Sequence, residues 1–144
     1  MIIRKATKKD LKDLAKIFRI EGAKPPYNRK RTLKKVLGIV KDDFRSNDVY
    51  VTDIDDKTVG FIMVKRDSGI KNKLWINELW ILKEYQGKGI GKEIMNKIEK
   101  IYKNRGIKEF KLAADTRKGG AFGFYKKIGY SFDKSIVFMK KVTN

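Results

Sequence analysis

A run of alternating glycines is the segment with the clearest chemistry in this sequence of 144 residues. The run consists of Gln86, Gly87, Lys88, Gly89, Ile90 and Gly91. It lies between an apolar stretch typical of a buried strand and an amphipathic stretch typical of a helix. Alternate glycines remove side chains from the backbone, and the first amides of a helix carry partial positive charge without an internal partner. This loop is therefore suited to a pyrophosphate, with Lys88 as an added cation.

Four interpretations compete for the glycine run. A Walker A loop requires Gly-x-x-x-x-Gly-Lys-Ser/Thr, which the run does not contain. A Rossmann loop requires Gly-x-Gly-x-x-Gly and follows the first strand of its unit, whereas Gly87, Gly89 and Gly91 have a different spacing and come late in the chain. The two remaining candidates are a coenzyme A pyrophosphate loop and a glycine-rich turn without a ligand.

The composition excludes several kinds of catalysis. The chain contains no cysteine and no histidine. Disulfides, thiolate nucleophiles, cysteine-ligated zinc and the Ser-His-Asp triad are therefore ruled out, and the commonest metal ligand is missing. Catalysis must use carboxylates, tyrosine, lysine, hydroxyls or backbone amides, and we expect no metal site.

The net charge is strongly positive, with 36 Lys+Arg against 17 Asp+Glu, which gives +19. A solvated, lysine-rich surface is the simpler explanation, and attraction of a polyanion such as nucleic acid or a phosphorylated cofactor is the alternative. No segment approaches the roughly 20 apolar residues of a membrane helix, and the first residues lack the apolar core of a signal peptide. We therefore expect a cytoplasmic protein without membrane contact.

Apolar periodicity predicts one mixed domain over residues 1–144. The predicted strands are residues 2–6, 49–52, 58–65, 73–82 and 107–114, followed by one or two strands within 130–141. The predicted helices begin near residues 10 and 33 and also cover residues 90–105 and 118–128. This order favours an α/β or α+β sandwich with helices on both faces of the sheet.

Two motifs resemble those of the GNAT superfamily of N-acetyltransferases. Gln86, Gly89 and Gly91 meet the family pattern Arg/Gln-x-x-Gly-x-Gly/Ala, and residues 121–130 resemble its Ala-x-x-x-Tyr-x-Lys-x-Gly-Phe segment. The order of predicted elements also matches, so the resemblance covers nearly the whole chain. It implies a mixed, mostly antiparallel central sheet of six or seven strands, about four helices on both faces, and a cofactor cleft where residues 73–82 and 107–114 splay apart.

The resemblance implies acetyl-CoA as the co-substrate. The family uses the backbone before the loop to hold the pantetheine arm, which corresponds here to Leu79, Trp80 and Ile81. Amides from Gln86 to Gly91 would hold the pyrophosphate. Many members have an asparagine seven residues before the tyrosine that corresponds to Tyr125. This chain has Lys118 there, which either contacts a cofactor phosphate or faces solvent.

Tyr125 and Glu78 are the candidate catalytic residues. Tyr125 aligns with the tyrosine that many members use to protonate the leaving thiolate, and the alternative is a packed core aromatic. Glu78 is the only acid in residues 73–82, where an unpaired buried carboxylate is costly. It is a candidate general base or amine-binding group, or else an ion-paired or solvent-facing side chain. Asp115 or a water molecule is the other candidate base.

The acceptor implied by the family is a primary amine of a small molecule, of a peptide or protein N-terminus, or of a lysine. The resemblance implies that residues 21–27 and the C-terminal strands shape its pocket. Dimers are common in the family, so the resemblance also implies that the protein can form a homodimer. The alternative function is a module of the same fold that binds nucleic acid or coenzyme A without catalysis.

Overall fold

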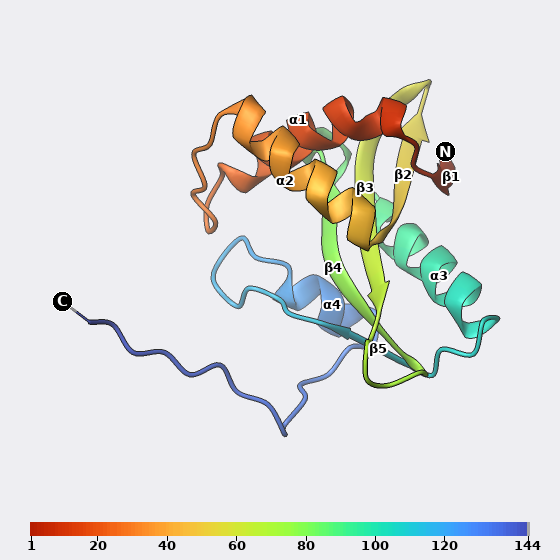
Figure 1. Cartoon of the computed structure of the whole chain (residues 1–144), viewed down its shortest axis with the longest axis vertical. Coiled ribbons are helices and arrows are strands. Elements are labelled where there is room, and N and C mark those ends of the chain that lie inside the picture. The colour runs from red at the N-terminus through yellow and green to blue at the C-terminus, as the bar shows by residue number, and fades with distance from the viewer. Residues whose placement is uncertain (144) are drawn as a thin grey trace.

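Helices cover both faces of a five-stranded sheet in the computed structural model, which describes residues 1–143 (Figure 1). The strands are β1 (Ile2–Lys5), β2 (Asp48–Ile54), β3 (Lys57–Arg66), β4 (Lys73–Ile81) and β5 (Glu109–Leu112). The helices are α1 (Leu11–Gly22), α2 (Leu33–Ser46), α3 (Ile90–Lys103) and α4 (Phe122–Lys127), with 3-10 helices η1 (Lys8–Asp10) and η2 (Lys83–Tyr85). Within residues 1–143, none of the helices combines the length and apolar character needed to cross a membrane.

The strands follow one another across the sheet in the order β1-β2-β3-β4-β5. All neighbouring pairs are antiparallel except β4 and β5, which run parallel. Asp55 and Asp56 connect β2 to β3 with φ values of 50° and 60°, as a two-residue hairpin turn requires. The predicted hairpin and the mixed, mostly antiparallel sheet are therefore confirmed.

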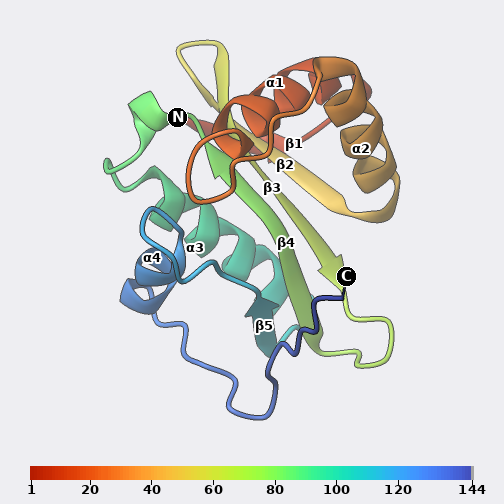
Figure 2. The same cartoon turned by 90° about the vertical axis from the view of Figure 1, so that its left-hand side faces the viewer.

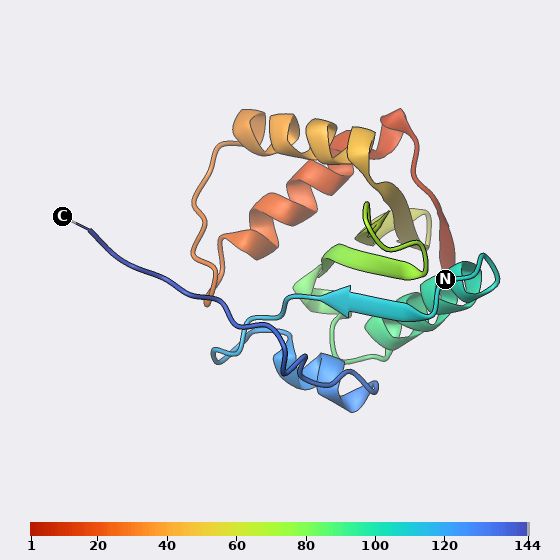
Figure 3. The same ribbon diagram turned by 60° about the horizontal axis from the view of Figure 1, so that its bottom comes forward.

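Two apolar cores lie on opposite faces of the sheet (Figure 3). Alternate side chains of β3 enter different cores, because successive side chains of a strand point to opposite faces. Phe61 and Met63 pack beneath α1 and α2, and Ile62 and Val64 pack against α3. The apolar face predicted for the third helix is confirmed, since its residues of that face lie in the second core. They are Ile90, Ile94, Ile98 and Tyr102, which are buried, and Ile101, which is partly buried.

A β-bulge in β4 determines the direction of the side chains around the site. Met63 of β3 pairs with Glu78 and Val64 pairs with Ile76, so Asn77 is the extra residue without a partner on β3. Without the bulge, Glu78 would share the face of Ile76, which packs in the core beneath α3. The bulge instead places Glu78 on the face that α1 and α2 cover.

The same position ends the pairing between β4 and β5. The parallel ladder extends only to the pair of Ile76 with Leu112, whereas β4 continues to Ile81. Residues 77–81 of β4 therefore have no strand partner on the β5 side. This separation of the two strands confirms the predicted splay.

The predicted C-terminal strands are wrong for the described residues. No strand forms within residues 129–143, so the sheet has five strands rather than six or seven. Asp133 forms an ion pair with Lys111 of β5. Beyond it the segment extends away from the sheet in Figure 1 and toward the viewer in Figure 2, and Phe138 and Met139 are each 91% exposed. Alternating apolar residues form a strand only beside an edge that pairs with them, and the neighbouring edge strand, β5, has 4 residues. Asn144, the last residue of the predicted domain, lies outside the described part of the chain.

The fourth helix is shorter than predicted, with α4 beginning at Phe122 rather than at residue 118. Gly119 precedes it with a φ of 89°, which is incompatible with a right-handed helix. A hypothetical Cβ at Gly120 would lie 2.4 Å from the carbonyl oxygen of Asp115, so the chain passes close to itself there. This close approach requires a loop of glycines before α4.

Gly60→Ala tests the close packing of β3 against β4. A Cβ at Gly60 would lie 2.8 Å from the carbonyl oxygen of Trp80. This oxygen belongs to the backbone, so it cannot move away by a change of side-chain rotamer. We expect the free energy of unfolding to fall by about 1–3 kcal/mol in urea titrations, the usual range for overpacking.

Gly38→Ala is the matched control on α2, where no atom lies within 4 Å of the added carbon. We expect this variant to be as stable as the parent or more stable by up to about 1 kcal/mol. Equal stability of the Gly60→Ala variant and the parent would contradict the packing described for β3 and β4.

Candidate active site

A cleft of about 810 Å³ opens where β4 separates from β5. It runs between β4, the glycine loop before α3, α4 and the connection from α1 to α2. The residues predicted to bind the cofactor that line it are Leu79, Trp80, Ile81, Gln86, Gly87, Gly89 and Gly91. The structure therefore brings most of that predicted set together around one concave surface.

The three glycines of the loop have two structural reasons. Gly87 and Gly89 have φ values of 74° and 81°, a conformation that L side chains rarely adopt, and a Cβ on either would point into open space. Gly91 lies in the first turn of α3, where a Cβ would be 3.1 Å from the ring of Phe124. The loop thus exposes its backbone to the cleft, and the unpaired first amides of α3 give it the donors that a diphosphate needs.

Three residues predicted to bind the cofactor do not line the cleft. Ile90 is buried in the core beneath α3. Lys88 lies with its Nζ 5.7 Å from the centre of the Tyr85 ring, and Lys118 is exposed beside the glycines that precede α4. Other lysines line the cleft instead, namely Lys24, Lys83, Lys92 and Lys127. Sequence reasoning did not assign Lys83, Lys92 and Lys127 to the site, because lysines are spread along the whole chain.

The outer part of β4 directs alternate backbone groups into the cleft. The carbonyl oxygen of Trp80 faces β3 at Gly60, whereas that of Ile81 accepts a hydrogen bond of 2.7 Å from Nε2 of Gln86 on the open side. Because backbone direction alternates along a strand, Leu79 also faces the open side. Leu79 and Ile81 therefore offer backbone groups to the cleft, and Trp80 offers its indole ring.

Glu21 joins the glycine loop to the end of α1. Its carboxylate is buried and accepts hydrogen bonds from Lys24 Nζ at 2.8 Å, from the amide of Lys83 at 3.3 Å and from Gln86 Nε2 at 3.4 Å. A buried carboxylate requires such partners. The side chain therefore holds the loop in place.

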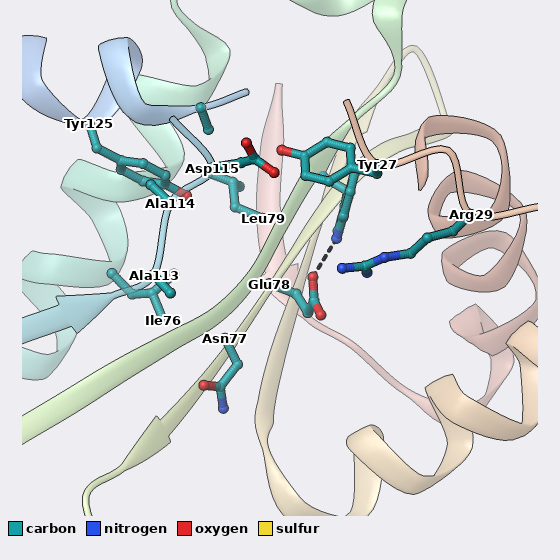
Figure 4. A pocket seen from close by; sticks show the side chains of 12 residues that line it. Tyr27, Arg29, Ile76, Asn77, Glu78, Leu79, Ala113, Ala114, Asp115 and Tyr125 are labelled. Carbon is teal, nitrogen blue, oxygen red and sulfur yellow. Dashed lines mark hydrogen bonds between the residues drawn. The ribbon is translucent and has the colours of Figure 1, made fainter. Parts of the chain in front are cut away.

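A smaller cavity of about 180 Å³ adjoins the cleft and contains both predicted catalytic residues (Figure 4). Its polar lining consists of Tyr27, Arg29, Asn77, Glu78, Asp115 and Tyr125. Tyr27 and Arg29 come from the connection between α1 and α2. Sequence reasoning placed the acceptor pocket partly in residues 21–27, which end before Arg29, and the C-terminal segment predicted to contribute lines neither cavity.

Tyr125 lines both cavities, and its ring packs against neighbouring aromatic rings. The ring centres of Phe124 and Tyr130 lie 5.0 Å and 5.7 Å away in edge-on arrangements. No hydrogen bond of its hydroxyl occurs within residues 1–143. Burial raises the pKa of Tyr125, and the nearby Tyr27 and Glu78 raise it further. The hydroxyl therefore remains protonated at neutral pH and can donate a proton to a stronger base.

Glu78 is half-buried, and its Oε2 accepts a hydrogen bond of 2.5 Å from the indole Nε1 of Trp80 (Figure 4). Burial raises the pKa of this carboxyl above its ordinary value, although the indole hydrogen bond lowers it in part. Neither oxygen forms an ion pair with another described residue. A carboxylate with a raised pKa, facing a cavity, is suited to accept a proton.

Asp115 has the opposite electrostatic environment. Its carboxylate accepts hydrogen bonds from the guanidinium of Arg117, the shortest of 2.6 Å, and from the Arg117 amide at 2.9 Å. These hydrogen bonds lower the pKa of Asp115 to about 2. Such a carboxylate is a weak base. In the described part of the chain, no cluster of three or more Asp, Glu, His or Cys residues could hold a metal ion.

Comparison with known proteins places this geometry in a family. The model of the acetyltransferase (GNAT) family matches residues 13–130. An uncharacterized N-acetyltransferase of Methanocaldococcus jannaschii is 32% identical over 132 residues, which cover 90% of this chain and 78% of that protein. The crystal structure of a possible acetyltransferase from Clostridium difficile 630 has a TM-score of 0.80 at 24% identity, covering 99% of this chain and 98% of that one.

Matches to functionally named relatives are shorter. The spermidine N(1)-acetyltransferase of Thermoplasma acidophilum is 35% identical over 79 residues, or 55% of this chain and 47% of that protein. The chain spans 35%, 62% and 47% of the lengths of the first three curated relatives that it matches. The family match itself covers most of the chain and includes both sequence motifs. The chain therefore belongs to the acetyltransferase (GNAT) family.

Proposed function

We propose that this protein transfers the acetyl group of acetyl-CoA directly to a primary amine. The observation that carries the proposal is the separation of β4 from β5 beyond Ile76 and Leu112. It opens one continuous site with an amide-rich loop at one end and Glu78 with Tyr125 at the other. Membership of the family supports the same reaction.

The cleft suits a long, phosphorylated thioester. Backbone groups of Leu79 and Ile81 would pair with amides of the pantetheine arm, as a neighbouring strand would. The loop amides and the first turn of α3 would bind the pyrophosphate, where the glycines leave the backbone uncovered. Lysines at the rim, including Lys24 and Lys92, would add favourable charge for the phosphates.

Acetyl-CoA supplies the thioester, whose carbonyl carbon the amine nitrogen attacks while the carbon–sulfur bond breaks. Glu78 would take the proton that the amine loses, because its raised pKa brings its basicity closer to neutral pH. Tyr125 would give its hydroxyl proton to the departing sulfur and recover one from Glu78 through water. The products are an acetamide and a free thiol, so protons balance over the cycle.

Glu78 is favoured over Asp115 as the base for an electrostatic reason. The hydrogen bonds from Arg117 stabilise the charged form of Asp115 and hold its pKa at about 2, so its affinity for a proton at neutral pH is low. Burial acts on Glu78 in the opposite direction. Asp115 then serves to position Arg117 and the loop before α4.

Gly89→Val tests the cofactor site. At 100 times its dissociation constant, acetyl-CoA should stabilise the parent protein by about 2.7 kcal/mol in thermal unfolding. The variant should lose this stabilisation, because valine cannot adopt the φ of 81° at Gly89 without strain and would cover the loop amides.

Gly106→Val is the matched control, since Gly106 has a φ of 91° with open space around it but lies after α3, at the end away from the glycine loop. It should be destabilised similarly and still respond to acetyl-CoA. Absence of a response in the parent protein, together with salt-sensitive binding of DNA or RNA, would favour the nucleic-acid-binding alternative instead.

Tyr125→Phe tests the proton donor. Removal of a general acid lowers turnover by about 100-fold or more, so kcat should fall by that factor while the Kd of acetyl-CoA stays the same. Release of free thiol gives the rate. Tyr130→Phe is the control, because the Tyr130 hydroxyl bonds Glu99 and lines neither cavity. Equal turnover in both variants would reject the role of Tyr125.

Glu78→Gln tests the base through the pH dependence of kcat/KM. The parent should lose activity as the pH falls through the raised pKa of Glu78, because the protonated carboxyl cannot accept the amine proton. Glutamine keeps an acceptor for the Trp80 indole and does not titrate, so the acidic limb should disappear along with most of the rate. Asp115→Asn should keep that limb, and its loss in this variant would assign the base to Asp115.

A further inference from the structure

The smaller cavity carries a cation beside its carboxylates. Arg29 lies on the connection between α1 and α2, and its guanidinium points into the cavity toward the side that holds Glu78 (Figure 4). Its contact is the ring of Tyr27, whose centre lies 5.8 Å from Cζ. The Arg29 amide donates to the carbonyl oxygen of Gly22 at 2.9 Å, but its guanidinium forms no hydrogen bond or ion pair with any residue from 1 to 143. Its five N–H donors are therefore open to a ligand.

The cavity contains one negative and one positive side chain that are not paired with an opposite charge. Asp115 and Arg117 form an ion pair with an N–O distance of 2.6 Å, so they largely neutralise each other. Glu78 has a hydrogen bond from an uncharged indole but no cationic partner in the described chain. Arg29 faces it without pairing. The site thus presents one carboxylate and one guanidinium that do not satisfy each other.

A second guanidinium lines neither cavity but adds positive charge near Glu78. Arg31, two residues beyond Arg29, has its Nε and Nη2 buried without a hydrogen-bond acceptor among the described residues, and its Cζ lies 5.1 Å from the centre of the Phe18 ring. The positive charges of Arg29 and Arg31 both act on Glu78. The wall of the cavity formed by this connection is therefore positive, opposite the carboxylate on β4.

We propose that the acceptor is a small amino acid-like molecule that carries a carboxylate as well as its primary amine. This inference rests on the proposed acetyl transfer. The amine would lie at Glu78, within reach of the thioester, and the carboxylate would bind the planar fork of Arg29, which suits two parallel hydrogen bonds. The unpaired carboxylate and the unpaired guanidinium that line the cavity would then each face a ligand group of opposite charge.

The charge of the cavity disfavours a polyamine. A second ammonium group would approach Arg29 and Arg31, where like charges repel. The net charge of +19 also repels a polycation over a longer range, whereas an amino acid has no net charge.

Pairs of acceptors that differ only in the carboxylate test the proposal. Release of free thiol is measured with a panel of amino acids and the corresponding amino acid amides, and with spermidine. We expect kcat/KM to be at least about tenfold higher for the favoured amino acids than for their amides, the size of one charge-assisted hydrogen bond. Equal or higher values for amides or for spermidine would overturn the inference and leave acetyl transfer intact. Thiol release with none of these amines, although acetyl-CoA binds, would overturn both.

Arg29→Gln assigns the effect to one side chain. The KM for the amino acid should rise by about tenfold, while the KM for its amide and the Kd of acetyl-CoA stay unchanged. Arg29→Lys keeps the charge without the fork, so it should restore part of the difference. Arg105→Gln is the control. Like Arg29, Arg105 lies over a tyrosine ring, with its Cζ 5.2 Å from the centre of the Tyr102 ring, but it lines neither cavity.

Two results would contradict the role of Arg29. An equal rise in KM for the amino acid and for its amide would mean that the Arg29 side chain shapes the cavity but does not bind the carboxylate. A weaker Kd for acetyl-CoA in Arg29→Gln, with acceptor preference unchanged, would mean that Arg29 binds a phosphate of the co-substrate.

Discussion

The site depends on one irregularity in the sheet, the bulge at Asn77 in β4. Up to Ile76 the backbone of β4 is paired with a strand on both sides, and beyond it only with β3. Backbone groups without a partner are costly away from water, so the open side of residues 77–81 favours a ligand that brings its own amides. The bulge also moves Glu78 away from the apolar core beneath α3. One inserted residue therefore both opens the cleft and directs its carboxylate.

Glu21 couples the two ends of this site through the body of the protein. It belongs to α1, which leads directly into the connection that carries Tyr27 and Arg29. Its carboxylate bonds the amide of Lys83 and the side chain of Gln86, just before the glycine loop. Because the carboxylate is buried, its partners cannot be replaced by water without cost. The connection that carries Tyr27 and Arg29 is consequently linked to the start of the glycine loop by one side chain.

The sequence predicted those parts of the site that depend on local structure. The glycine loop and the helix after it follow from short-range spacing, and Ile90–Lys103 of α3 has the expected apolar face. The bulge at Asn77 left no signal, because an extra residue in a strand is visible only against its partner. The position of Arg29 beside β4 left no signal for the same reason, since only tertiary packing brings the two together. The strands predicted within residues 130–141 failed because a strand requires an edge that accepts it, which composition alone does not provide.

Two carboxyls and a phenol in one small cavity acquire different proton affinities from their surroundings. Burial raises the pKa of Glu78, whereas hydrogen bonds from Arg117 lower the pKa of Asp115. Burial also raises the pKa of Tyr125, so the phenol stays protonated. Such divergence suits the proposed roles, because a carboxyl with a raised pKa holds an accepted proton more tightly, whereas a phenol that stays protonated can donate to a strongly basic leaving group. In the proposed reaction, Asp115 stays charged and Tyr125 is protonated at rest, so Glu78 would take the amine proton and Tyr125 would give a second proton to sulfur.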